Sequence, residues 1–198
     1  MVDQQKDYSL SADMNVKLDQ TPSSLISEVA VMNHLWNLEL HQGTELETGL
    51  KLERELVEQR FRSGDCSLIM AWERQTGEAI GYGMVVPSFL HEYIADFEMG
   101  FVKQSHRRKG VFSDIVSGAR GTASQLGYIR MTCQPLNEEA ARIFARKGFT
   151  PATPFTEPFS GKTEPRMIAR LYPTPYMNLF ERIGFNWKNF MLATGSLD

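Results

Sequence analysis

The sequence predicts a mixed α/β or α+β domain in which helices cover a sheet. Short apolar runs with strand spacing alternate with longer segments whose apolar residues recur at helical spacing. The predicted order is strand, two helices, three strands, helix, strand, helix and a strand-rich end. A chain of 198 residues that is 42% hydrophobic has enough apolar side chains for one core.

The first half of the chain divides into segments of different period. Residues 1–12 are polar without periodicity, which predicts a flexible arm. Apolar and polar residues alternate over 14–19, as in a short strand with one buried face. Helical spacing follows over 25–36, behind residues that can cap a helix, and a second amphipathic helix is predicted over 45–61.

In the second half, from residue 67 onward, the spacing of apolar residues changes from that of a helix to that of strands. Two apolar runs, 67–72 and 79–86, flank a polar turn and predict a hairpin. The remaining predicted elements are a strand over 93–102, a helix over 110–126, a strand over 128–133, a helix over 137–147 and a last strand over 167–171. We therefore expect one domain over 13–171 and an aromatic carboxy-terminal extension over 172–198, packed on the domain or on a partner subunit.

Composition argues against several classes of protein. A net charge of −3 with 23% charged residues is unlike a basic nucleic-acid-binding protein. No stretch approaches the roughly 18 apolar residues of a membrane span, and the amino terminus lacks the apolar core of a signal peptide, so a cytoplasmic protein is expected. Cys66 and Cys133 lie inside apolar runs, which favours buried structural thiols. The histidines show no metal-ligand spacing, and no metal is predicted.

The most informative segment runs from Val102 to Ser113. A predicted strand end is followed by the basic residues Arg107, Arg108 and Lys109, and then by Gly110 at the start of a helix. Free amides and the helix dipole at such a helix start can bind phosphate, and a glycine lets the phosphate approach closely. The alternative is a solvated basic turn before an ordinary helix.

A second segment, 137–149, favours the anion site over this alternative. The two segments together resemble motifs A and B of the GNAT acetyltransferase superfamily, in which arginine or glutamine, two residues, glycine, one residue, then glycine or alanine binds the coenzyme A pyrophosphate. Arg107, Gly110 and Phe112 occupy the three positions, and Phe112 departs from the usual small residue. The resemblance implies the GNAT-like acyl-CoA N-acyltransferase fold, a central, mixed and mostly antiparallel sheet flanked by helices, with acetyl-CoA as co-substrate. It implies that these residues bind coenzyme A: Phe101, Val102, Arg107, Arg108, Lys109, Gly110, Val111, Phe112, Ser113, Asn137 and Phe144.

Two carboxylates are candidates for the catalytic base. Asp96 and Glu98 lie two residues apart on a predicted strand and so share a face. The resemblance favours Asp96, with Glu98 a close second, although either could be a polar residue of an edge strand. Family members often carry a tyrosine as the acid where this chain has Phe144, so water, Ser113 or Tyr82 must then assist the leaving thiolate.

The acceptor is predicted to be an amine, on a small molecule or a peptide. Candidate acceptor-binding residues are Tyr82, His91 and Tyr93. Glutamates in the first two helices would favour a cationic amine, or they form only the wet face of those helices. The leading hypothesis is an acetyl-CoA-dependent N-acyltransferase with direct attack in a ternary complex. The alternatives are a weak or inactive GNAT-like module in a larger assembly and an O-acyltransferase. No nucleic-acid or membrane partner is expected, and a homodimer is one assembly that the aromatic extension would allow.

Overall fold

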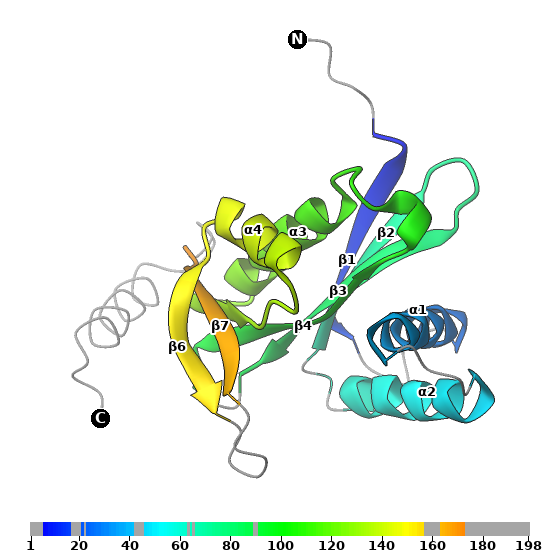
Figure 1. Cartoon of the computed structure of the whole chain (residues 1–198), viewed down its shortest axis with the longest axis horizontal. Helices are drawn as coiled ribbons and strands as arrows, with labels where there is room; N and C mark the ends of the chain where they lie inside the picture. Colours follow the sequence, from blue (N-terminus) through cyan, green and yellow to red (C-terminus); the bar gives the residue numbers. More distant parts are fainter. Residues whose placement is uncertain are drawn as a thin grey trace.

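The protein is built around one seven-stranded sheet with helices on both faces (Figure 1). The computed structural model describes residues 6–16, 21, 23–41, 46–62, 64, 66–88, 91–156 and 163–172. The strand order is β1-β2-β3-β4-β5-β7-β6. The β4–β5 pair is parallel, and the other neighbouring pairs are antiparallel.

The elements follow one another in the predicted order, which confirms the mixed α/β fold. The strands are β1 (Tyr8–Val16), β2 (Cys66–Glu73), β3 (Ala79–Pro87), β4 (Ile94–Val102), β5 (Arg130–Cys133), β6 (Thr150–Thr156) and β7 (Thr163–Arg170). The helices are α1 (Ser23–His41), α2 (Leu46–Arg62), α3 (Val111–Gln125) and α4 (Glu138–Arg146), with a 3-10 turn at Gln104–His106.

One predicted boundary is corrected and one strand is added to the predicted elements, both at edges of the sheet. β1 begins at Tyr8, so residues 8–12 pair with β2 and do not belong to an arm. β6 was missing from the predicted elements because Pro151 and Pro154 interrupt its strand pattern. It lies at the sheet edge, the position where proline is tolerated because no further strand needs its N–H. Of the predicted extension over residues 172–198, residues 173–198 lie outside the described residues.

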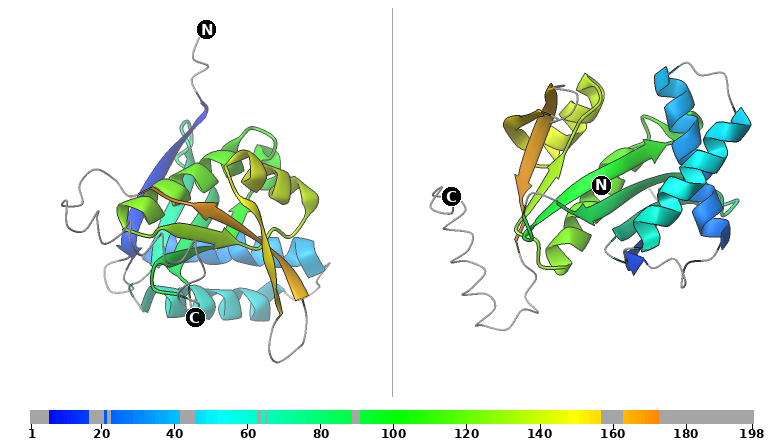
Figure 2. Two further views of the ribbon diagram at one scale, coloured as in Figure 1. Left: turned by 90° about the vertical axis from the view of Figure 1, so that its left-hand side faces the viewer. Right: turned by 90° about the horizontal axis from the view of Figure 1, so that it is seen from below.

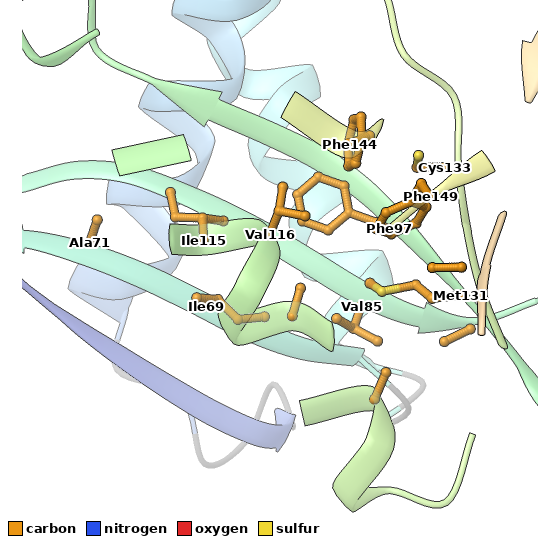
Figure 3. Packing of buried hydrophobic residues seen from close by; sticks show 14 of the residues in the cluster. Ile69, Ala71, Val85, Phe97, Ile115, Val116, Met131, Cys133, Phe144 and Phe149 are labelled. Atoms are coloured by element: carbon orange, nitrogen blue, oxygen red, sulfur yellow. The ribbon is translucent and has the colours of Figure 1, made fainter. Parts of the chain in front are cut away.

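The two faces of the sheet carry separate cores. α3 and α4 cover one face, where Ile115 and Val116 pack on Ile69 and Val85 (Figure 3). α1 and α2 cover the other face, where Val29 and Phe61 join the buried side chains of β2 and β3. Figure 2 shows that α1 and α2 lie over β2 to β4, away from β6 and β7. Among the residues that the structure describes, no helix covers the β6–β7 end of this second face.

A bulge in β4 lies just beyond the point where β4 stops pairing with β5, and this β4–β5 pairing joins the β1–β4 half of the sheet to the β5–β7–β6 half. Tyr82 and Met84 of β3 pair with Phe101 and Glu98 of β4, so β4 has one extra residue between these pairs, and Met99 adopts a positive φ of 53°. β4 pairs with β5 only from Ile94 to Phe97. Beyond Phe97, no strand of the described residues adds to this edge of β4.

Candidate active site

The predicted anion turn lies at the carboxyl end of β4. Arg108 and Gly110 have φ values of 63° and 84°, and Gly110 caps α3 in the left-handed conformation. Left-handed residues in a short turn direct neighbouring amides toward one side. A Cβ on Gly110 would meet only the Tyr8 hydroxyl among the described residues, 3.8 Å away. The space beside this glycine is therefore open to a ligand.

The backbone N–H groups of this turn can serve as hydrogen-bond donors to a ligand. Among the described residues, the backbone N–H groups from Arg108 to Ser113 donate none of the backbone hydrogen bonds of loops, turns and caps. The first amides of a helix have no partner within the helix itself. The exposed side chains of Arg107, Arg108 and Lys109 surround the turn. Backbone amides, a helix dipole and cationic side chains are together suited to binding a diphosphate.

An acidic residue in the first turn of α3 is neutralised by the amino-terminal strand. Lys6 and the Tyr8 hydroxyl both donate hydrogen bonds to Asp114. Partial burial opposes ionisation, but these hydrogen bonds and the Lys6 charge outweigh it and lower the pKa of Asp114. Sequence reasoning missed this cluster, because it treated residues 1–12 as an arm.

The open edge of β4 leads directly to the turn. Phe101 and Val102, predicted to line a pantetheine arm, are buried next to this edge. Unpaired strand edges accept extended ligands through backbone hydrogen bonds. A chain of amides such as pantetheine would fit between β4 and β5 in this manner.

Phe112 and Phe144, which differ from the residues usual in the family motifs, belong to one aromatic cluster. Phe112 and Phe144 pack edge to face with centroids 5.7 Å apart, and each also packs against Phe97. Phe144 further packs on Phe149, and Figure 3 shows Phe97, Phe144 and Phe149 gathered at one end of the core. The Phe112 side chain therefore points into the protein and leaves the turn amides clear. Val111 is also buried, so only its backbone is offered to a ligand.

The two candidate bases have different surroundings. Asp96 is 8% exposed, accepts a hydrogen bond from Thr132 of β5, and pairs with Arg166 of β7 at 3.3 Å. Glu98 is half-buried and pairs with Arg60 of α2 at 2.8 Å. Burial raises the pKa of Glu98, Arg60 opposes that rise, and Asp96 adds to it. Asp96 thus joins β4 to β5 and β7, whereas Glu98 is more exposed and is reached from α2.

The partners of these carboxylates come from distant parts of the chain. Arg60 and Arg166 lie on α2 and β7, and no local sequence pattern links either to β4. Several glutamates of the possible acidic wall, among them Glu39, Glu47 and Glu53, lie outside the described side chains. Within the described part of α2, Glu58 pairs with Arg54 and Arg62, and Glu55 is exposed, as on the solvent face of a helix.

The predicted acceptor residues are not brought together. Tyr82 is fully buried beneath α1, and its hydroxyl donates to Asn33 at 2.9 Å. Its predicted role in substrate binding is therefore corrected to a role in the core. His91 and Tyr93 form the turn before β4, where the Tyr93 amide donates to the His91 ring. This turn lies at the opposite end of β4 from Gly110.

Asn137 caps α4. Its side-chain oxygen accepts a hydrogen bond from the Ala140 amide at 2.8 Å. The cap fixes the start of the helix that carries Phe144, on the far side of the opening from β4. The predicted hydrogen bond from Asn137 to a pantetheine arm would use the side-chain NH₂ group, which the cap does not occupy.

The remaining reactive side chains are buried. Burial raises the pKa of the Cys66 thiol to about 12 and also raises that of Cys133. Neither thiol is poised as a nucleophile. The described residues contain no group of three metal-ligating side chains, and none of their helices is long and apolar enough to cross a membrane.

Comparisons with known proteins agree with this geometry. Residues 31–149, more than half of the chain, match the Acetyltransferase (GNAT) family. None of the curated proteins matches the chain in sequence.

Several solved structures share the fold at low sequence identity. An aminoglycoside 6'-N-acetyltransferase complexed with coenzyme A has a TM-score of 0.63 at 13% identity, over 84% of this chain and 99% of that one. Escherichia coli ElaA has a TM-score of 0.60 at 12% identity, over 82% and 99%. A GNAT acetyltransferase from Staphylococcus aureus has a TM-score of 0.59 at 10% identity, also over 82% and 99%. The motifs, the topology and the family match converge, and the chain belongs to the GNAT acetyltransferase family.

Proposed function

We propose that the protein transfers an acetyl or similar acyl group from coenzyme A to an amine, by direct attack within a ternary complex. One observation carries the proposal. β4 parts from β5 after Phe97 and leads into an amide-rich turn at the start of α3. An extended ligand with a diphosphate at one end would lie along β4 with its phosphates at Gly110. The coenzyme A bound to the related aminoglycoside 6'-N-acetyltransferase supports this choice of ligand.

The coenzyme would be held mainly by backbone groups. The amides from Arg108 to Ser113 would bind the diphosphate, and the open edge of β4 near Phe101 and Val102 would bind the pantetheine amides. Coenzyme A supplies a thioester whose carbonyl carbon is open to a nucleophile. Running from the turn along β4, the thioester would reach the bulge at Met99, beside Glu98.

Glu98 would act as the general base. An amine arrives mostly as an ammonium ion, and Glu98 would take one proton to free the lone pair. The C–N bond then forms as the C–S bond breaks, and the second proton lost by nitrogen ends on the sulfur. Phe144 has no proton to give, and the Tyr82 hydroxyl donates to Asn33. Water or Ser113 would therefore carry that proton to the thiolate.

A second candidate function is coenzyme binding without turnover. Phe144 stands where the family often has a tyrosine acid, and it lies in the aromatic core. A module of this kind would bind coenzyme A and release no thiol. Thiol release therefore distinguishes the two functions.

The test is acetyl-CoA binding by calorimetry with two matched glycine variants. Gly110 and Gly127 lie at opposite ends of α3, both have positive φ, and neither is closely packed. Gly110→Trp is expected to abolish binding, and Gly127→Trp to preserve it. Amine-dependent thiol release in the same samples would establish transfer. Absence of binding by the natural protein, or equal loss in both variants, would contradict the proposal.

A further inference from the structure

Two carboxylates on one face of β4 each hold an arginine, but the two pairs are unlike. The Asp96–Arg166 pair is enclosed, with side chains only 12% and 10% exposed. The Glu98–Arg60 pair opens to solvent, with side chains 32% and 48% exposed. The first pair ties β4 to β7, because Arg166 also donates to Thr132 between them. The second pair ties no strands together and is accessible to a ligand.

The accessible pair lies where the acceptor amine must arrive. Glu98 pairs across the sheet with Met84, whose side chain belongs to the core under α1 and α2. Directly opposed residues on neighbouring strands point to the same side. Glu98 therefore points toward the helices and lies next to the bulge where β4 leaves β5. Arg60 reaches it from the last turns of α2.

This pairing restricts the charge of the acceptor. An ammonium group that binds Glu98 places a second cation beside the Arg60 guanidinium, which pairs with the same carboxylate at 2.8 Å. An acceptor with a carboxylate of its own can restore the charge balance, since guanidinium binds carboxylate with two parallel hydrogen bonds. Among the described side chains of α2, Glu58 is already paired with Arg54 and Arg62.

We infer that the acceptor is an amino acid, or another amine with a carboxylate one or two carbons from the nitrogen, and that Arg60 binds this carboxylate. The inference rests on the proposed function, because it places the amine at Glu98. Arg60 is thus an acceptor-binding residue, and Glu98 receives the proton of the same molecule.

The test compares acceptors that differ only in the carboxylate. L-amino acids, their amides and the corresponding decarboxylated amines are assayed by thiol release from acetyl-CoA, on the alkaline plateau of the pH profile. Arg60→Gln is compared with Arg62→Gln, which removes the same charge from the same helix. Arg60→Gln is expected to raise KM for amino acids about tenfold or more, the usual effect of losing a charged hydrogen bond. Its effect on amides and decarboxylated amines should be small, and Arg62→Gln should change neither. Arg60→Lys should retain part of the preference.

A binding measurement keeps this inference separate from the proposed function. If acetyl-CoA binds but no acceptor releases thiol, transfer is contradicted, and the inference is judged by calorimetry of amino acids against protein saturated with coenzyme A. Binding that needs both the carboxylate and Arg60 supports it. The inference is overturned if amino acids and their amides are used or bound equally well. It is also overturned if Arg60→Gln and Arg62→Gln have equal effects while the melting temperature is unchanged.

Discussion

The Arg107 side chain donates a hydrogen bond to the Val102 carbonyl, 2.9 Å away, and so closes the turn that it begins. The same guanidinium lies over the Phe101 ring, 5.5 Å from its centroid. The motif arginine therefore fixes the path of the backbone between β4 and α3. Its contribution to a coenzyme site would come through the position of the turn amides as well as through its charge.

Arg107→Ala should therefore weaken coenzyme A binding more than the loss of one exposed charge can explain. We expect about a tenfold loss, consistent with losing a charge-assisted hydrogen bond that orders the turn. Arg142→Ala removes an exposed arginine of α4 and is the control. Calorimetry at two salt concentrations checks the result. A loss that disappears at high salt would indicate a purely electrostatic role.

Tyr8→Phe should destabilise the protein by about 1 kcal/mol, because it removes one hydrogen bond to Asp114. The pKa of Asp114 is lowered, so its ionised form stabilises the fold above the ordinary aspartate pKa, and this stability is lost as pH falls through the lowered value. The difference between the natural protein and Asp114→Asn should shrink at acid pH. Urea unfolding at neutral and acid pH measures both effects, with Tyr172→Phe at an exposed position as the control.

Glu98→Gln should reduce thiol release by about 100-fold to 10,000-fold, the range for loss of a general base. Because the pKa of Glu98 is raised, the acid limb of kcat/KM should lie above the ordinary glutamate value. Arg60 opposes this rise in the pKa, so Arg60→Gln should move the acid limb to a still higher pH. A limb that does not move in Arg60→Gln would show that another group acts as base.

The same raised pKa fixes the sign of the effect of Glu98 on stability. The contribution of Glu98 to the free energy of unfolding is fully present below the ordinary glutamate pKa. It is lost as pH rises through the raised pKa of the folded protein. Glu98→Gln should therefore not destabilise the protein at neutral pH, in contrast to its effect on turnover. Thermal unfolding of the two proteins side by side checks this separation.

Phe144→Ala should lower the free energy of unfolding by about 3–5 kcal/mol, as expected for a large aromatic removed from a core. Phe144 also supports Phe112 at the start of α3, so coenzyme binding should weaken in the fraction that remains folded. Leu136→Ala, at a position 57% exposed, is the control for stability. Unchanged binding in the folded variant would show that the turn does not depend on the cluster.

Both thiols should be unreactive in the folded protein. Cys66 and Cys133 are buried, and burial raises the pKa of each. We expect a thiol reagent to modify them only after urea unfolding. Cys133→Ser should retain thiol release from acetyl-CoA, which an acyl-cysteine intermediate at this position would not allow.

Local patterns were enough to predict most of the fold. Strand and helix periods, the hairpin turn and the glycine before α3 gave the order of the elements and the anion turn. The start of β1 was missed because residues 8–12 gain their order from pairing with β2 and from the contact of Tyr8 with Asp114. The partners of Asp96 and Glu98 depend on contacts across the sheet and between layers, which no local period encodes. Tyr82 was misassigned because a hydroxyl in a strand does not reveal that a helix covers it.

The four residue pairs between β4 and β5 are the backbone connection between the two halves of the sheet, and Asp96, Thr132 and Arg166 bridge the strands at that point. A molecule lying in the opening touches both halves, so its dissociation constant also reports how firmly they are joined. Substitutions at this bridge should alter coenzyme affinity without contacting the coenzyme. The affinity for a coenzyme would thus depend partly on how rigidly the two halves of the sheet are held together.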